Sequence, residues 1–376
     1  MTKTRKQAIA IYVPKWLYQY DVGITIFVKG LFQSIKKSGR YRLIKLSPRK
    51  CRFKTREEAQ AFATKHDLAL VIYHGSRVIP KDRACEQGLD YLESCVPFLN
   101  PREVHIADDK FETKRILKNL GIPVLPDFSI KNRAELVATT NEGALYVAKP
   151  HNAESGNGVK LIKRNSDTFF EYHDGSWERI RVRDTKKGII LAGTLGRHAG
   201  ILIGIFAIGL VFLFLDIFHA ATYLILCLSD IAFLFHFQKK ISRNFRYNPL
   251  MLEPFFGDDM NEFYCLRCTV IGNEVVEAAK KSNKKNVTPN ISHGGKASKT
   301  VLSDEQRTMA VTATKAMGAT YAGIDLLVSN GKTVLCEVNV GPIGVYCEQT
   351  EVDVGKILGE YAMQYCDQKK AAGTIF

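Results

Sequence analysis

The sequence predicts an α+β protein: an N-terminal α/β domain, then a second α+β region that an apolar two-helix insert interrupts. Strand-like and helical runs alternate over the first 105 residues, which is typical of an open sheet covered by helices. Strand-like runs paired around short turns mark the C-terminal part. Between them, residues 188–237 carry only three formal charges, Arg197, Asp216 and Asp230. We therefore divide the chain into residues 1–105, 106–187, 188–237 and 238–376.

Net charge and cysteine content limit the class of protein. The 376 residues carry a net charge of +15, which favours anionic partners such as a nucleotide or an anionic membrane surface. Nine cysteines, odd in number and scattered, predict a reducing compartment without a disulfide framework. The basic clusters are not interleaved with aromatic residues, so we expect no nucleic-acid partner.

The N-terminal domain is predicted from short apolar runs that alternate with amphipathic ones. We expect strands at residues 7–13, 41–46 and 68–73, and helices at residues 22–38 and 56–66. The domain contains no glycine-rich nucleotide fingerprint. We therefore expect it to bind a substrate or to serve as a scaffold.

A helix and a loop of small residues follow this domain. Asp109-Lys110 open the helix, and Gly121 closes it with Pro123 just beyond. Strands at residues 144–149 and 158–162 then bracket the loop, which suits a flap whose backbone N–H groups close on phosphates. An ordinary hairpin loop is the alternative.

The apolar insert, residues 188–237, is predicted to be a transmembrane helical hairpin. Its stretches at residues 199–215 and 217–237 are near the length that a bilayer requires. Basic residues flank both sides, so the positive-inside rule places the globular domains and both termini in the cytoplasm. We thus expect a multi-pass membrane protein with two helices, or alternatively a buried pair of core helices. Asp230 is a candidate for pairing or self-association within the membrane.

The most informative stretch is a predicted hairpin at residues 322–339, where two apolar runs flank Asn330-Gly331. A two-residue loop would place Ile324 opposite Glu337. A three-residue loop at residues 330–332 gives one apolar face instead. That register pairs Ile324 with Val338, Leu326 with Cys336, and Val328 with Val334.

The opposite face of this hairpin gathers oxygen ligands in the three-residue register. Asp325 lies opposite Glu337, and Asn339 lies beside Gly323. Like charges paired across strands repel each other, so a cation between them is expected. Ligation by oxygen alone selects a hard ion such as Mg²⁺. The alternative is an exposed edge hairpin with scattered acids.

Several motifs occur in a characteristic order along the chain. They are Asp109-Lys110, Lys149-Pro150 with the glycine flap, Leu252-Glu253-Pro254-Phe255, Arg267 before Val270-Ile271-Gly272, Asn290 with Gly294-Gly295, Ala322-Gly323-Ile324-Asp325, and Glu337-Val338-Asn339. This order resembles the ATP-grasp superfamily, and within it the ribosomal-protein glutamate ligases, over about residues 100–365. The final Asp…Glu-x-Asn set is the specific part of the resemblance.

The resemblance implies an ATP-grasp fold after the N-terminal α/β domain, with ATP between two α+β subdomains. The nucleotide-binding residues would be Lys110, Lys149, Ser155, Gly156, Gly158, Glu253, Pro254, Phe255, Glu262 and Asn290. Asp325, Glu337 and Asn339 would bind Mg²⁺ (or Mn²⁺), and Arg267 and Lys281 would be catalytic. The family reaction converts a carboxylate to an acyl phosphate, which an amine then attacks.

Two positions depart from the glutamate ligases. Cys265 stands where they carry an acid at the ribose, a role that Glu262 would take over. Lys280 and Lys281 stand where they carry an arginine near the transferring phosphate. A cation would still contact the transferring phosphate, but these departures leave the identity of the substrate open.

We therefore expect a membrane-anchored, ATP-dependent ligase that joins small-molecule or peptide carboxylates to amines and releases ADP and phosphate. The insert falls within the flap subdomain, so this moving lid would be tied to an anionic membrane surface. Two alternatives stay open: an ATP-dependent kinase, and a nucleotide-binding membrane scaffold without catalysis. An oligomer is compatible with each of them.

Overall fold

The chain folds into two compact units in the computed structural model. The first comprises residues 1–126 and 256–376, and the second comprises residues 127–255. The structure describes residues 6–12, 22–74, 82–101, 104, 107, 109–151, 158–173, 175–186, 188–193, 245–258, 260, 262–291, 294–340 and 346–373.

A parallel four-stranded sheet forms the N-terminal part of the first unit, and three of its strands match the predicted ones. Its strands are β1 (Ala8–Tyr12), β2 (Arg42–Leu46), β3 (Leu68–Tyr73) and β4 (Phe98–Leu99), in the order β2-β1-β3-β4. The accompanying helices are α1 (Val22–Ser38), α2 (Arg56–His66) and α3 (Arg83–Glu93). The sequence did not predict α3, which Asp82 caps by accepting a hydrogen bond from the backbone N–H of Cys85.

An antiparallel five-stranded sheet forms the C-terminal part of the same unit. Its strands are β13 (Phe263–Ile271), β14 (Glu274–Asn283), β15 (Lys296–Lys299), β16 (Tyr321–Ser329) and β17 (Lys332–Asn339), in the order β15-β14-β13-β16-β17. Helices α4 (Lys110–Asn119) and α8 (Asp304–Ala316) cover one face, and α9 (Cys347–Thr350) and α10 (Val354–Ala371) follow β17. Ser303 and Gln306 form a capping box at α8, so this helix begins where its sequence predicts.

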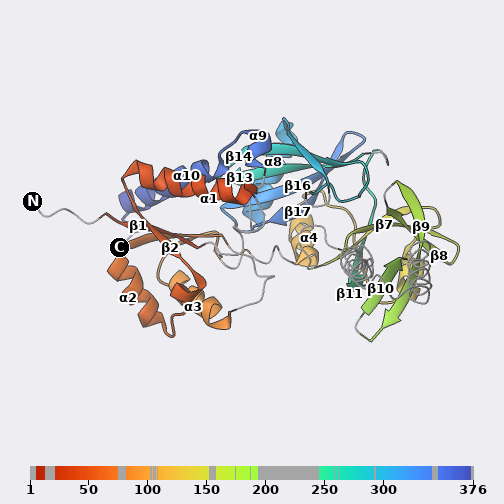
Figure 1. Ribbon diagram of the computed structural model, residues 1–376, viewed down its shortest axis with the longest axis horizontal. Helices are drawn as coiled ribbons and strands as arrows, with labels where there is room; N and C mark the ends of the chain where they lie inside the picture. The colour runs from red at the N-terminus through yellow and green to blue at the C-terminus, as the bar shows by residue number, and fades with distance from the viewer. Residues whose placement is uncertain are drawn as a thin grey trace, which may run out of the picture. The chain divides into compact units, whose positions relative to one another are not determined.

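Helices α1 and α10 lie side by side and join the two sheets of the first unit (Figure 1). They share a buried cluster with Ile271 and Tyr321 of the antiparallel sheet and with residues of β1 and β3. Gly355 permits the close approach, because a Cβ atom there would lie 1.8 Å from the carbonyl oxygen of Phe27. The C-terminal helix is therefore part of the N-terminal core.

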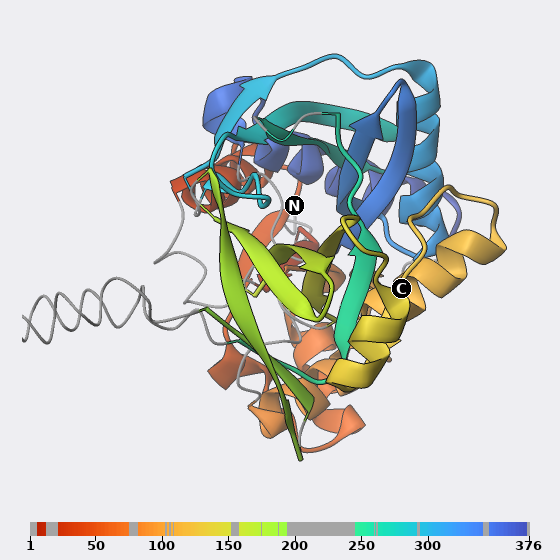
Figure 2. The same cartoon turned by 90° about the vertical axis from the view of Figure 1, so that its right-hand side faces the viewer.

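The second unit is an antiparallel sheet with α5 (Arg133–Thr139) against one face. Its eight strands are β5 (Phe128–Ile130), β6 (Leu145–Pro150), β7 (Lys160–Asn165), β8 (Thr168–His173), β9 (Ser176–Thr185), β10 (Gly188–Gly193), β11 (Phe245–Tyr247) and β12 (Leu250–Pro254). They lie in the order β11-β10-β9-β8-β7-β6-β12-β5. Strands β7 to β10 are the twisted lime ribbons in Figure 2. The sequence predicted only the β6 and β7 part of this sheet.

The predicted membrane hairpin requires correction. Its first residues, 188–193, form β10, which pairs with β9 through Ile190 opposite Arg183. The rest of the predicted hairpin, including Asp230, lies outside the described residues. Among the residues that the structure describes, no helix is long and apolar enough to cross a membrane. This finding contradicts the predicted multi-pass localisation, and nothing in the described chain supports an anionic membrane surface as a partner.

Candidate active site

The β16–β17 hairpin brings the predicted oxygen ligands together, but by a different route from the one predicted. Ser329 pairs with Lys332, so the turn has two residues, and both Asn330 and Gly331 have positive φ. The predicted three-residue loop is therefore wrong. The pairing shifts between Asp325 and Leu326, which leaves Cys336 as the extra residue of a β-bulge.

Beyond the bulge, the two strands pair in the predicted register over the residues of the candidate site. Asp325 lies opposite Glu337, and Gly323 lies opposite Asn339, as predicted. On the other side of the bulge, Leu326 pairs with Leu335 rather than with Cys336. Leu335 thereby reaches the core, while the acids stay on the opposite face.

One face of the antiparallel sheet is therefore apolar and the other is polar. Leu266 and Cys268 of β13 face the core beneath α8, so the alternate residues Cys265 and Arg267 lie on the polar face. Lys281 lies opposite Cys265, and Asp325 lies opposite Arg267. Cross-strand pairing thus places side chains from four strands on one surface.

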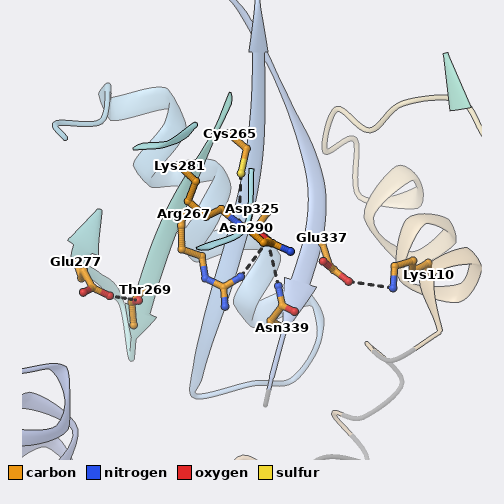
Figure 3. A network of polar contacts seen from close by, with 10 residues as sticks. All are labelled: Lys110, Cys265, Arg267, Thr269, Glu277, Lys281, Asn290, Asp325, Glu337 and Asn339. Carbon is orange, nitrogen blue, oxygen red and sulfur yellow. Dashed lines mark hydrogen bonds and ion pairs between the residues drawn. The ribbon is translucent and has the colours of Figure 1, made fainter. Parts of the chain in front are cut away.

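Asp325 is the centre of this surface (Figure 3). Its Oδ2 atom lies 3.0 Å from Nη1 of Arg267, and its Oδ1 atom lies 2.9 Å from Nζ of Lys281. Asn339 donates from Nδ2 to Oδ2 at 3.4 Å, and Nζ of Lys281 also donates to Oδ1 of Asn290 at 3.4 Å. The Asp325 side chain is 11% exposed, so two cations compensate a charge that is nearly removed from water.

The charges of this cluster reinforce one another. Burial alone would raise the pKa of Asp325, but Lys281 and Arg267 outweigh burial and lower the pKa below its usual value. Burial opposes the charged forms of Arg267 and Lys281 as well, yet Asp325 raises the pKa of each. Burial raises the pKa of the Cys265 thiol to about 12, so this thiol is neutral at physiological pH. At neutral pH the cluster therefore holds one carboxylate and two cations.

Gly323 makes room for the Arg267 guanidinium. A Cβ atom on Gly323 would lie 2.4 Å from Nη2 of Arg267, closer than any real contact allows. The absence of a side chain at this position therefore lets Arg267 lie across β16 and reach Asp325.

Glu337 has a different environment from its cross-strand partner. Its Oε1 atom lies 3.0 Å from Nζ of Lys110, and its side chain is 31% exposed. The N-cap Asp109 begins α4 at this lysine. The structure thus places Lys110 at the second predicted metal ligand, and its contact with a phosphate stays a prediction.

The three predicted metal ligands fit a hard cation. Asp325 and Glu337 lie directly opposite each other, and the Oδ1 atom of Asn339 is turned away from Asp325 because Nδ2 donates to it. Two carboxylates and an amide oxygen are a set that Mg²⁺ accepts when phosphate or water oxygens complete its six ligands. In the described part of the chain no group of three or more His, Cys, Asp or Glu residues is placed to hold a metal, so a site here would depend on two carboxylates together with the amide oxygen of Asn339.

The predicted nucleotide residues of the second unit form a separate cluster. Nζ of Lys149 in β6 lies 2.7 Å from Oε2 of Glu253 in β12, and both side chains are buried. Pro254 ends β12, and the N–H of Phe255 donates to the carbonyl oxygen of Leu145. The unit ends at Phe255, so the predicted nucleotide-binding segment from Glu253 to Phe255 ends at the unit boundary.

The predicted phosphate flap is only partly visible. Ser155 and Gly156 lie outside the described residues. Gly158 has a positive φ of 74°, and its carbonyl oxygen accepts a hydrogen bond of 2.6 Å from the Tyr247 hydroxyl. The buried ion pair of Lys160 with Glu171, at 2.6 Å, follows at the start of β7. Sequence reasoning missed this pair because its partners come from different strands.

The predicted substitute for the ribose acid, Glu262, is bound to a neighbour. Its Oε2 atom lies 3.4 Å from Nζ of Lys280, and both side chains are partly exposed. Lys280 therefore points away from the polar face that carries Lys281, because alternate residues of a strand face opposite sides. Of the two lysines that replace the family arginine, only Lys281 reaches Asp325.

Comparisons with known proteins identify the fold to which this arrangement belongs. Two solved structures match almost the whole chain: the ATP-grasp ligase PsnB (TM-score 0.54, 12% identity, 96% of this chain and 99% of that one) and the D-cycloserine synthetase DcsG (TM-score 0.54, 13% identity, 96% and 99%). The chain has the ATP-grasp fold. Residues 248–360 also match the family described as the RimK-like ATP-grasp domain.

Two sequence relatives each match about a third of the chain. A probable alpha-L-glutamate ligase of Picosynechococcus sp. is 40% identical over 111 residues, which cover 29% of this chain and 35% of the relative. The tetrahydromethanopterin:alpha-L-glutamate ligase of Methanocaldococcus jannaschii is 32% identical over 121 residues, covering 32% and 42%. The chain thus matches well under half the length of these relatives.

Proposed function

We propose that this protein is an ATP-dependent carboxylate–amine ligase. The observation that carries the proposal is the buried Asp325 with Arg267 and Lys281, opposite Glu337 and beside Asn339, within a RimK-like domain. The relatives that are alpha-L-glutamate ligases support an amino-acid amine as one substrate. The fold neighbour PsnB, solved with a precursor peptide, supports a peptide carboxylate as the other.

In the proposed reaction, a carboxylate oxygen of the substrate attacks the γ-phosphorus of ATP and ADP leaves. The amine then attacks the acyl carbon, and phosphate leaves with one of the original carboxylate oxygens. Asp325, Glu337 and Asn339 would hold Mg²⁺, which when bound neutralises phosphate oxygens. Little covalent help from the protein is required, because positioning and charge compensation lower the barrier.

Each cation of the site has a role that suits its chemistry. Arg267 presents a planar guanidinium, which can hold the substrate carboxylate or acyl phosphate by two parallel hydrogen bonds. Lys281 is a point charge held by Asp325 and Asn290, and it would face the transferring phosphate. In the second unit, Lys149 and the segment from Glu253 to Phe255 would serve the nucleotide.

The test is turnover of ATP with defined carboxylates and amines. Purified protein is incubated with ATP, Mg²⁺, and a panel of amino acids and short acidic peptides, and ADP and new amide products are measured. We expect ADP and amide to form in equal amounts. If the substrate carboxylate is labelled with ¹⁸O, one labelled oxygen must appear in the released phosphate.

The same assay separates the alternatives. ADP with a stable phosphorylated product and no amide would instead indicate a kinase. Nucleotide binding without any ADP release across the panel would favour a non-catalytic protein. As a site control, Glu337→Gln should raise the Mg²⁺ concentration required for half-maximal ADP release, whereas the exposed Glu274→Gln should leave it unchanged.

A further inference from the structure

A second buried carboxylate lies on the polar face of the antiparallel sheet. Glu277 in β14 lies opposite Thr269 in β13, two residues beyond Arg267 on the same face. Its side chain is 3% exposed. No motif of the sequence marked this residue, because its neighbours come from β13 and α9.

Two hydroxyl groups hold this carboxylate. Thr269 donates to Oε2 at 2.7 Å (Figure 3), and Thr350 of α9 donates to Oε1 at 2.6 Å. The Thr350 hydroxyl also lies 2.9 Å from the carbonyl oxygen of Tyr346. Backbone N–H groups of Gln349 and Thr350 already donate to that carbonyl, so the single hydroxyl proton of Thr350 is available to Glu277.

Among the residues that the structure describes, no cation pairs with this carboxylate. Glu277 forms no ion pair in the described part of the chain, in contrast to Asp325 on the same face. A buried carboxylate without a countercharge is costly, and an apolar pair would join a strand to a short helix at a lower cost. Packing alone therefore does not explain why a glutamate occupies position 277.

The contact partner of Glu277 points to that reason. Helix α9 has only four residues, and Tyr346 directly precedes it. The ring centroid of Tyr346 lies 5.9 Å from Nζ of Lys281, within the range of a cation–π contact. Glu277 thus ties down the helix that carries an aromatic neighbour of the lysine bound to Asp325.

We propose that Glu277 is a positioning residue of the candidate active site. Joined to β13 through Thr269, it anchors α9 and so holds Tyr346 beside Lys281. Loss of the anchor frees Thr350 at the end of this one-turn helix, so that Tyr346 at its start is held less firmly beside Lys281. Lys281 is then less restricted to the direction of Asp325. The kinetic part of this proposal rests on the proposed ligase function, and the structural part does not.

The test compares Glu277→Leu with Glu277→Gln in the full-length protein. Leucine removes both acceptors, whereas glutamine can accept from one threonine and donate to the other. Amide hydrogen exchange in a peptide that covers residues 346–350 should accelerate roughly 10- to 100-fold in Glu277→Leu, as expected for loss of a hydrogen bond to a charged group. Glu277→Gln should keep exchange within about twofold of the parent.

A second pair of variants tests the anchor from the other end. Thr350→Val should reproduce the fast exchange of Glu277→Leu, and Thr350→Ser should restore slow exchange, because serine keeps the hydroxyl. These variants also keep the proposal testable if Glu277→Leu does not fold. Unchanged exchange in both Glu277→Leu and Thr350→Val would overturn the proposal.

Kinetics then separate positioning from plain stability. We expect Glu277→Leu to lower kcat for ADP release about tenfold while the KM for ATP changes less than about twofold, because Lys281 acts on the transferring group. Equal loss in Glu277→Gln and Glu277→Leu would show that the charge itself is used, against a positioning role. If the parent protein releases no ADP, the proposed function fails, and hydrogen exchange still decides the structural part.

Discussion

Asp325 and Glu277 are carboxylates buried on the same face of the same sheet, but their charges are compensated differently. Asp325 lies between two cations, at 3.0 Å from Arg267 and 2.9 Å from Lys281. Glu277 accepts hydrogen bonds from two threonine hydroxyls and has no ion pair among the described residues. In our proposals, the first carboxylate belongs to a site that binds charged ligands, and the second holds a fixed contact between a strand and a helix.

The largest effect is expected when Asp325, the carboxylate between two cations, loses its charge. Asp325→Asn should reduce ADP release by at least about 100-fold, since it removes the charge of a proposed metal ligand and the countercharge of two cations. It should also lower the free energy of unfolding by about 3–5 kcal/mol, because Arg267 and Lys281 are left buried without this countercharge. Steady-state kinetics and urea denaturation measure the two effects.

A double variant separates the two effects of Asp325→Asn. Adding Lys281→Met removes one of the unpaired cations, so part of the lost stability should return while activity stays absent. Glu274→Gln, at an exposed position in β14, is the control, because this carboxylate has no proposed role in the site. ADP release by Asp325→Asn within about threefold of the parent would contradict the assigned role.

His74 extends the comparison to a buried ionisable group whose contacts are apolar. Its side chain is 0% exposed, neither ring nitrogen has a hydrogen-bond partner among the described residues, and burial lowers its pKa to about 4. The neutral ring packs between Phe27 and Tyr321. Because the unfolded pKa is about 6.5, this group contributes stability above pH 6.5 that is lost as the pH falls toward 4.

The size of this effect follows from the shift in pKa. A pKa lowered by about 2.5 corresponds to about 3 kcal/mol in the free energy of unfolding, of which about 2 kcal/mol should be lost between pH 7 and pH 5. His74→Phe keeps an aromatic ring and should remove this part of the pH dependence in urea denaturation. The partly exposed His66→Gln is the control. Equal pH dependence in the parent and His74→Phe would show that His74 does not titrate during unfolding.

A smaller effect tests the space beside Asp325 without removing a charge. Gly323→Ala would place a Cβ atom 2.4 Å from Nη2 of Arg267, so the guanidinium must move away from Asp325. We expect about a tenfold loss in kcat/KM for the carboxylate substrate, because the bidentate contact is displaced but the charge stays nearby. The KM for ATP should change little. An unchanged kcat/KM would mean that Arg267 is free to act from another position.

Sequence reasoning recovered what depends on neighbouring residues. The position of the Asn-Gly turn and the Asp109 cap follow local rules, although the predicted three-residue loop was wrong. The order of motifs was also enough to indicate the ATP-grasp fold and the set of Asp325, Glu337 and Asn339. These elements are encoded within a few residues of each other or within one hairpin.

What sequence reasoning missed depends on contacts between distant segments. Glu277 acquires its role only when Thr350 packs against β14, and Lys149 meets Glu253 only across two strands. Strand β10 was hidden because Gly188–Gly193 has the composition of the apolar run that follows it. Hydropathy alone does not distinguish a strand buried in a sheet from the start of a membrane helix.

The smallest expected effect concerns the turn that sets up the register of the two acids. Gly331 has a φ of 72°, and an alanine there should lower the free energy of unfolding by about 1 kcal/mol. The bulge at Cys336 lies between this turn and the pair of Asp325 with Glu337, so strain at the turn need not reach the site. We therefore expect ADP release by Gly331→Ala to equal that of the parent. If ADP release fell together with the free energy of unfolding, the turn and not the bulge would set the register of the two acids. The polar face would then depend on residues at both ends of the hairpin.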